Sequence, residues 1–558
     1  MPHESPAAVN GISWAGGPAP ATTDITRPPG PDAGWEVSQS PLGRSGTAAM
    51  LFAVLSGLIT LGYHLFSYPL YDTDEGIYME RAWSVITEGT LSPYTYIYDH
   101  APAGWLLIAA WDFVLPRQFL TFGNPVNSGR VLMLLLHAAS VFFLFEIARK
   151  LSGSLLAPTI ATFFFNFSPL AIYYERMALL DNIMVFWVLL SIYLLLRRRI
   201  RVFTGLWSGL AFGVSVLSKE NAIFFAPTIF YLLYRRAKGD ASSRFIIMFW
   251  LFAAIASSSV YFLFATLKNE LLPSGLDFSL AHPPAGHSSL LYEMWYQLHR
   301  NQGTLFSHGS FLYVMWLPKD GFLIVAGTAA MLIALLLGWR ERRRDPGLLI
   351  AGTLAFEIAF YLARGSVLLD FYVIPLIPMY ALCIALVADR ALRRIPIPHA
   401  RAAIPAVCAA LLLLPTGGYL LTHGQQGQLQ ASDVYYLPLT YLQQEQISWI
   451  RQHIPADARI VSDDDIWVAL HDGHPSYPND VSHWNAVGDP AVRNHEFGGG
   501  NWQDIDYIVL SNGMRQAMIG NNAGGQENWI LNALDNHSVE VWHAGRGDVQ
   551  LEIYQVQK

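Results

Sequence analysis

The sequence predicts a mainly α-helical, polytopic membrane protein: a bundle of about eleven spans with outer interfacial helices, followed by a small extracytoplasmic α/β domain. Of the 558 residues, 53% are hydrophobic and only 14% are charged, whereas soluble domains carry about 25% charged residues. The mean hydropathy is +0.31. Long apolar runs alternate with short polar breaks over 46–421, and the composition becomes that of a soluble domain over 430–558.

The same composition excludes several classes of protein. A chain this rich in apolar residues is not intrinsically disordered as a whole. Its net charge of −7 provides no basic field for binding nucleic acid. The two cysteines, Cys383 and Cys408, both lie in apolar runs, and they match neither a disulfide framework nor a metal-ligand spacing. We interpret them as small buried apolar residues.

The apolar runs predict the membrane spans, each of which needs about 17–25 residues. The stretch Trp105–Leu115 is too short, lies between Pro102 and Pro116, and contains Asp112. Whether this stretch crosses the membrane decides the topology. The eleven candidate spans lie near 47–67, 129–148, 155–173, 178–196, 202–217, 221–234, 245–267, 320–339, 347–364, 371–389 and 402–421.

The basic residues settle the topology. If Trp105–Leu115 does not cross, all the Lys and Arg clusters that follow fall on the cytoplasmic side, as the positive-inside rule requires. These clusters lie within 149–150, 197–201, 235–244, 340–344 and 390–401. We therefore expect Trp105–Leu115 to lie along the outer interface of the cell (plasma) membrane. The domains are then a disordered cytoplasmic tail over 1–45, a transmembrane domain over 46–425 and an extracytoplasmic domain over 430–558.

The C-terminal region reads as a small α/β domain. Its pattern predicts helices over 438–454 and 528–534 and strands over 458–462, 506–510, 539–542 and 550–556, the last two forming a pair. Asp463, Asp464 and Asp465 follow a predicted strand, and we favour a solvated acidic turn over a metal site. Four residues fit either a surface that stacks on a sugar or acceptor or the domain core: Tyr477, His483, Trp484 and Trp502.

The topology collects ionisable residues on the outer side of the membrane. Charged groups at a membrane boundary are costly unless they are paired or functional, so we expect a polar cavity there. Asp74 and Glu75 closely follow the first span. One carboxylate fits a general base and the other its orienting neighbour. Equally, Asp72 or Thr73 fits the cap of a helix that begins near Glu75.

Further outer segments carry charged residues. Glu175, Arg176 and Asp181 fit either a binding site or an ion pair at the interface. Lys219 lies in a polar break between two apolar runs, and a lysine on the outer side opposes the positive-inside bias. That position favours a functional role, such as holding a phosphate as a point charge. His100 fits either a donor to an anion or an ordinary loop histidine.

The late spans contribute Arg364 and Tyr372 to the same outer side. Tyr372 opens a span whose first turn contains prolines, a pattern that also fits a simple helix entry. The histidines of the large outer loop match no metal-binding spacing, and we assign no metal ligands. They are His282, His287, His299 and His308.

Taken in order, these motifs form a recognisable set. An Asp-Glu pair follows the first span, then come a His-Ala-Pro break, an Arg…Asp motif, a lysine after the next hairpin and a Tyr-x-x-Pro-x-x-Pro span. The set resembles the GT-C class of membrane glycosyltransferases, in particular the protein O-mannosyltransferase and lipid A aminoarabinose transferase branch. The resemblance covers about 46–392, and Asp74-Glu75 with Tyr78 is similar to the D-E-x-x-Y pattern of that family.

The resemblance implies a glycosyltransferase that moves a sugar from a polyprenyl-phosphate donor to an extracytoplasmic acceptor, with inversion. It implies Asp74 as the general base, Glu75 as its assistant and Asp181 as a second acidic catalytic residue. Arg364 substitutes for a basic residue that relatives commonly have before the tyrosine. The substrate-binding residues implied are His100, Glu175, Arg176, Lys219, Arg364 and Tyr372.

The resemblance also indicates which cofactors and partners to expect. It requires no cofactor, although the acidic cluster leaves a divalent cation open. The expected partners are the donor lipid, membrane lipid and a protein, glycan or lipid acceptor, without nucleic acid. Two alternatives are a lipid-sugar transporter or flippase and a non-catalytic binding protein. A transporter should show inverted repeats or paired broken helices, and the sequence has no such symmetry, which favours glycosyl transfer.

Overall fold

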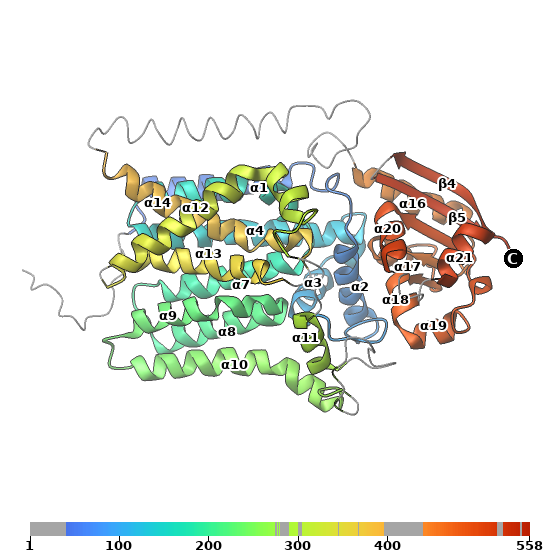
Figure 1. Ribbon diagram of the computed structural model, residues 1–558, viewed down its shortest axis with the longest axis horizontal. Coiled ribbons are helices and arrows are strands. Elements are labelled where there is room, and N and C mark those ends of the chain that lie inside the picture. Colours follow the sequence, from blue (N-terminus) through green and yellow to red (C-terminus); the bar gives the residue numbers. More distant parts are fainter. Residues whose placement is uncertain are drawn as a thin grey trace, which may run out of the picture.

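The computed structural model describes residues 41–273, 276, 278, 289–299, 304–343, 345–365, 368–395, 439–521, 528–546 and 549–558. The predicted span 402–421 and most of the predicted tail 1–45 lie outside the described residues, as do Cys408, His282 and His287. The described part forms a long helical bundle with a smaller, sheet-containing domain at one end (Figure 1).

The bundle accounts for the apolar runs of the sequence. Five stretches are long and apolar enough to cross a membrane, namely Arg44–Gly62, Pro125–Ser152, Ser243–Leu267, Leu312–Glu341 and Asp370–Leu392. The protein is therefore a membrane protein, while the count of eleven spans stays a prediction. The bundle helices are α1 (Arg44–Gly62), α4 (Pro125–Ser152), α5 (Leu156–Phe167), α6 (Pro169–Tyr174), α7 (Leu180–Leu195), α8 (Val202–Ser218), α9 (Ala226–Ala237), α10 (Ser243–Leu267), α12 (Leu317–Glu341), α13 (Gly347–Ala363) and α14 (Leu376–Leu392).

Two predicted spans are interrupted by proline-containing breaks. The run 155–173 is divided into α5 and α6 at Ser168, whose backbone is extended and whose hydroxyl caps the helix that begins at Pro169. The run 221–234 begins as a 3-10 helix, Glu220–Phe225, before α9. Proline has no amide proton to donate and suits the first turn of a helix. Each break therefore starts a new helix rather than continuing the previous one.

Helices α2 (Thr73–Thr87), α3 (Ala103–Phe113) and α11 (Leu290–His299) lie at the end of the bundle that faces the sheet-containing domain (Figure 1). Asp72 caps α2, with its carboxylate accepting from the Asp74 amide, and Glu75 accepts from the Asp72 amide to complete a capping box. The predicted cap at the start of this helix is thus present. Helix α3 stands where the sequence predicts an outer interfacial helix, and its position at an interface stays a prediction.

The C-terminal domain contains a five-stranded sheet with the order β2-β1-β3-β5-β4. Strand β1 pairs in parallel with β2 and β3, and β5 pairs antiparallel with β3 and β4. Strands or helices stand at each of the six predicted positions. The elements are α16 (Leu439–His453), β1 (Ile460–Ser462), α17 (Asp464–His471), β2 (Asp480–Ser482), α18 (His483–Gly488), α19 (Pro490–Glu496), β3 (Tyr507–Ser511), α20 (Asn512–Asn521), α21 (Asn528–His537), β4 (Ser538–Arg546) and β5 (Val549–Val556).

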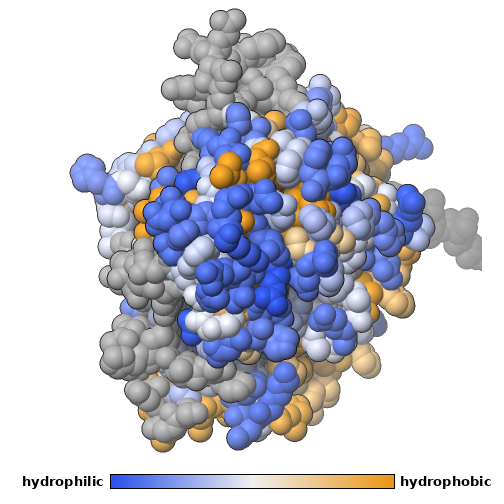
Figure 2. Space-filling view, turned by 90° about the vertical axis from the view of Figure 1, so that its right-hand side faces the viewer, coloured by the Kyte–Doolittle hydropathy of each residue, from blue (hydrophilic) through white to orange (hydrophobic). Residues whose placement is uncertain are grey.

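The domain turns a largely hydrophilic face away from the bundle (Figure 2). On its other side, α17 packs against α2. Gly76 of α2 makes this approach close, because a Cβ atom there would lie 2.3 Å from the carbonyl carbon of Asp464. The start of α2, which carries the Asp-Glu pair of the sequence, is therefore held directly against the C-terminal domain.

Candidate active site

Asp74 lies in the first turn of α2 and is partly exposed, unlike the buried Glu75 beside it. The hydroxyl of Tyr78, one turn further along α2, donates to Asp74 Oδ1 at 3.0 Å. The Asp74 amide donates to Asp72 Oδ1 at 2.9 Å. The carboxylate of Asp74 is thus oriented by a side chain of its own helix while keeping some access to other molecules.

A buried ion pair lies beside Asp74. Lys219 Nζ is 3.2 Å from Asp181 Oδ2, with side-chain exposed fractions of 3% and 0%. Lys219 follows the end of α8, and Asp181 lies in the first turn of α7. The Lys219 ammonium also lies 5.1 Å from the ring centroid of Tyr372 and 5.3 Å from that of Phe371. Aromatic faces attract cations, so the ammonium is held between a carboxylate and two rings.

The electrostatics connect Asp74 to this pair. Burial raises the pKa of Asp74, and the charges of Lys219 and His100 oppose that increase without cancelling it. Burial also raises the pKa of Asp72, reinforced by the nearby carboxylates of Asp74 and Asp370. A carboxyl group with a raised pKa is a stronger base than an ordinary one once it is ionised.

His100 and Arg364 border the cluster. His100 Nδ1 lies 3.5 Å from Glu220 Oε2, and its ring meets the edge of Tyr78 at 6.1 Å between centroids. Arg364 packs over the ring of Tyr361 at 4.5 Å, and Tyr361 lies 6.3 Å from Tyr372. His100 therefore adjoins the Asp74 side of the cluster, whereas a layer of aromatic rings separates Arg364 from Lys219.

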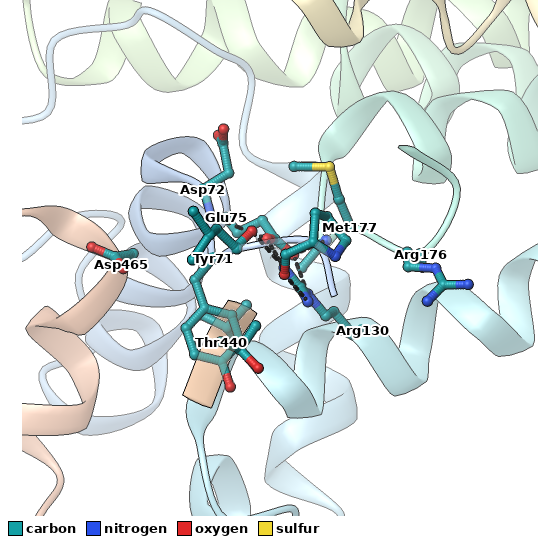
Figure 3. A network of polar contacts seen from close by, with 12 residues as sticks. Tyr71, Asp72, Glu75, Arg130, Arg176, Met177, Thr440 and Asp465 are labelled. Carbon is teal, nitrogen blue, oxygen red and sulfur yellow. Dashed lines mark hydrogen bonds and ion pairs between the residues drawn. The ribbon is translucent and has the colours of Figure 1, made fainter. Parts of the chain in front are cut away.

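Glu75 is turned into the bundle, where it forms a buried pair with Arg130 of α4 (Figure 3). Arg130 Nε donates to Glu75 Oε1 at 2.9 Å, and its Nη2 donates to Glu75 Oε2 at 2.5 Å. Glu75 Oε1 also accepts from the Ala178 amide at 2.7 Å. Arg130 in turn donates to the carbonyl oxygens of Pro69 and Leu70. Glu75 thus fixes the start of α2 to α4 and to the loop before α7.

Arg130 was not predicted from the sequence as a residue of the site. A signal was present, because this arginine lies at the outer end of a predicted span, against the positive-inside bias. In the sequence, Tyr78 stands out only as part of the D-E-x-x-Y pattern. Its hydrogen bond to Asp74 follows from helical geometry, since residues four apart lie on one face of a helix.

Glu175 and Arg176 make other contacts. Glu175 Oε2 lies 3.3 Å from Nδ1 of His137 on α4. Arg176 donates to the carbonyl oxygens of Thr60 and Tyr63 at the end of α1, and of Tyr68 in the loop beyond. Its guanidinium points away from Glu75 and Arg130 (Figure 3). Arg176 therefore stabilises the loop between α1 and α2. Asp181, by contrast, pairs with Lys219.

The C-terminal domain borders the site and corrects one expectation. Asp463, Asp464 and Asp465 do not form a solvated acidic turn, because all three are buried, with exposed fractions of 5%, 1% and 7%. The reason is the contact with α2, where Thr73 Oγ1 donates to Asp463 Oδ1 at 3.0 Å. Tyr477 belongs to the domain core: it is 0% exposed, and its hydroxyl donates to backbone carbonyls of α16 and the residue that follows it.

Comparisons with known proteins agree with this architecture. Residues 108–263 match the family described as dolichyl-phosphate-mannose-protein mannosyltransferase, a stretch that includes Asp181 and Lys219 but not Asp74. A crystal structure of ArnT from Cupriavidus metallidurans bound to undecaprenyl phosphate is 15% identical, with a TM-score of 0.56, covering 92% of this chain and 98% of that one.

The oligosaccharyltransferase AglB from Archaeoglobus fulgidus, in complex with an inhibitory peptide and a dolichol-phosphate, is 12% identical with a TM-score of 0.53. The match covers 88% of this chain and 72% of that one. The protein has the GT-C fold. The resemblance of its sequence to the GT-C class, in the mannosyltransferase and ArnT-like branch, is confirmed. No curated protein matches this GT-C chain by sequence.

Proposed function

We propose that this GT-C protein is a glycosyltransferase that moves a sugar from a polyprenyl-phosphate donor to an acceptor on the extracytoplasmic side of the membrane. The observation that carries the proposal is the position of Asp74 beside the buried pair of Lys219 and Asp181. A glycosyl transfer of this kind needs a base for the acceptor and a cation for the departing phosphate. A carboxylate and an ammonium group that fit these roles, those of Asp74 and Lys219, lie in one cluster of this GT-C protein.

The comparisons support the class of donor. The similar ArnT structure holds undecaprenyl phosphate, and the similar AglB structure holds a dolichol-phosphate. The family matched by residues 108–263 is also described by a dolichyl-phosphate sugar. In our proposal the lipid tail of the donor stays among the bundle helices, while its phosphate reaches the cluster at the end of the bundle.

Each residue of the cluster has its own role in the proposed reaction. Asp74 removes the proton from the acceptor hydroxyl as the oxygen attacks C1 of the sugar, and the bond from C1 to the phosphate oxygen breaks with inversion. Lys219 stabilises the negative charge that develops on the departing phosphate. Asp181 holds Lys219 in place. Glu75 positions Asp74 by fixing the start of α2 to Arg130.

The remaining predicted residues have supporting places in the proposal. His100, beside Tyr78, donates to the acceptor or the sugar, and Tyr372 keeps Lys219 directed toward the phosphate. Arg364 contributes positive charge behind the aromatic layer. Glu175 and Arg176 shape the loops around the site from their buried positions. The transfer requires no cofactor in this scheme, and the N-terminus faces the cytoplasm while the C-terminal domain lies outside.

The test uses purified full-length protein in lipid with a panel of radiolabelled polyprenyl-phosphate sugars. Release or transfer of sugar is compared between the wild type and the variants Asp74→Asn and Asp240→Asn, the latter removing an exposed carboxylate of the loop between α9 and α10. We expect Asp74→Asn to lower turnover by about 10²–10⁴-fold, the usual contribution of a general base, and Asp240→Asn to leave it unchanged. Equal turnover in all three proteins would refute the assignment of Asp74 as the base. Movement of the donor lipid across the bilayer without sugar transfer would refute the proposed transferase activity.

A further inference from the structure

A second cluster of carboxylates lies outside the proposed active site, where α2 meets the C-terminal domain. Asp463 and Asp464 are at the junction of β1 and α17, and His483 is the first residue of α18. One potential ligand atom from each of these residues lies within 4.8 Å of the other two. All three are buried, with exposed fractions of 5%, 1% and 1%. Three groups that ligate metals thus converge in the interior.

Both ring nitrogens of the His483 imidazole are without a hydrogen-bond partner among the residues that the structure describes, although the side chain is buried. The carboxylates of Asp480 and Glu80 lie close to Asp464 and are also buried, with exposed fractions of 1% and 3%. A buried polar group without a partner costs about 1–3 kcal/mol, and more when it is charged. A buried imidazole without a partner in the described structure, beside two buried carboxylates, therefore indicates a ligand-binding site.

The charge of the cluster specifies the kind of ligand. The arginine whose charge acts on Glu80 is Arg81. Its Nη2 atom already pairs with Asp99 Oδ2 at 2.9 Å. Asp463 and Asp464 are both buried, and neither forms a salt bridge with a lysine or arginine in the part of the chain that the structure describes. Buried charges in proteins are paired or coordinate metals. The charge of this cluster therefore suits a cationic ligand.

We propose that Asp463, Asp464 and His483 bind a divalent transition-metal cation that joins the C-terminal domain to α2. Mixed carboxylate and imidazole ligands suit Zn²⁺ and its neighbours in the transition series, whereas Ca²⁺ and Mg²⁺ prefer oxygen ligands alone. His483 supplies one nitrogen and Asp464 one oxygen. Asp480 and Glu80 add negative charge around the site.

Asp463 supports the proposal through its other contacts. Its Oδ1 accepts from Thr73 Oγ1 of α2 and from the Asp464 amide, both at 3.0 Å, and its Oδ2 accepts from Ser511 Oγ at 2.6 Å. A carboxylate has about four acceptor positions, so either oxygen still has room for a metal. Such outer contacts orient metal ligands and commonly change affinity by about 10–100-fold. Here they connect the metal site to the helix that carries Asp74.

The experiment measures metal binding to the full-length protein. Chelator-treated protein is dialysed against Zn²⁺, and bound metal is counted by mass spectrometry for the wild type, Asp464→Asn and His483→Gln. Matched controls are His495→Gln and Asp535→Asn, which change exposed residues of the same domain. We expect one zinc per chain in the wild type and controls, and at least about tenfold weaker binding in the two ligand variants. Binding that Asp464→Asn and His483→Gln leave unchanged overturns the proposal.

Thermal unfolding provides a readout that does not depend on these counts. In chelator, Asp464→Asn should melt no lower than the wild type, because it removes a buried negative charge that has no ion-pair partner among the described residues. In Zn²⁺, the wild type should melt higher than Asp464→Asn, because a ligand that binds the folded state stabilises it. If Zn²⁺ leaves the melting temperature of the wild type unchanged, or if Ca²⁺ or Mg²⁺ raises it as much as Zn²⁺, the site is not the one proposed.

Discussion

Lys219 Nζ and Asp181 Oδ2 lie 3.2 Å apart in the interior of the helical bundle, at the ends of two different helices. Neither side chain reaches solvent, so each charge depends on the other. Removing one partner of such a pair leaves the other buried and uncompensated, which costs about 3–5 kcal/mol, whereas replacing both costs far less. The pair therefore permits a test that separates folding from catalysis.

We predict that Lys219→Met lowers the melting temperature strongly, and that adding Asp181→Asn restores most of the loss. Transfer activity should stay low in both proteins, because neither retains a cation for the departing phosphate. Melting is followed in detergent and turnover with the labelled donor identified for the wild type. Recovery of activity together with stability in the double variant would contradict the assigned role of Lys219.

The pH dependence of the reaction should report Asp74. Burial raises the pKa of this carboxyl group, and the group must be ionised to accept a proton. Activity is therefore lost as the pH falls through that raised pKa, and the acidic limb of kcat/KM against pH lies above the range of an ordinary aspartate. The profile is measured with the donor at concentrations below its KM.

The neighbours of Asp74 give this prediction a direction. The charge of His100 lowers the pKa of Asp74, so His100→Gln should move the acidic limb to higher pH. The exposed His299→Gln serves as the control and should leave the limb in place. A limb that moves to lower pH in His100→Gln would argue against Asp74 as the titrating base.

The contacts at this site explain what the sequence can and cannot predict. The proximity of Asp74, Asp181, Lys219 and Tyr372 was predictable, because the apolar runs place these residues on the same side of a membrane. The burial of Asp463 was not predictable, because local pattern describes an acidic turn and says nothing of a partner that lies hundreds of residues away. The hydrogen bond from Thr73 to Asp463 spans 390 residues of sequence.

Long helices could be predicted from the sequence, whereas short elements could not. Apolar runs predicted the positions of α1, α4, α8 and α10, since burial in lipid or in a bundle needs only composition and length. Short elements such as β2 and α17 were missed because three to eight residues carry too little pattern to be distinguished from a loop. Their stability comes from the sheet and from the contact with α2, neither of which the local sequence contains.

Glu75 should behave as a positioning residue. Glu75→Gln leaves Arg130 buried without a charged partner, so we predict a loss of about 3–5 kcal/mol in stability and a lower melting temperature. Turnover per folded molecule at low temperature should fall much less than in Asp74→Asn, because the Glu75 oxygens contact Arg130 and the Ala178 amide. A variant that melts like the wild type but has lost all turnover would place Glu75 in the reaction itself.

Gly76 tests whether the close contact between α2 and the C-terminal domain matters for activity. An alanine Cβ at this position would lie 2.3 Å from the carbonyl carbon of Asp464 and 2.4 Å from the amide nitrogen of Asp465. Both atoms belong to the backbone, so α17 must move away as a unit. We predict that Gly76→Ala costs about 1–3 kcal/mol of stability, as overpacking does elsewhere, and lowers turnover by displacing the first turn of α2.

The control is Gly321→Ala, since a Cβ atom there meets nothing within 4 Å. Melting temperature, turnover and the rate of proteolysis between the bundle and the domain are compared for both variants. Should Gly76→Ala match Gly321→Ala in all three measurements, α2 and α17 are not in firm contact in the protein in solution.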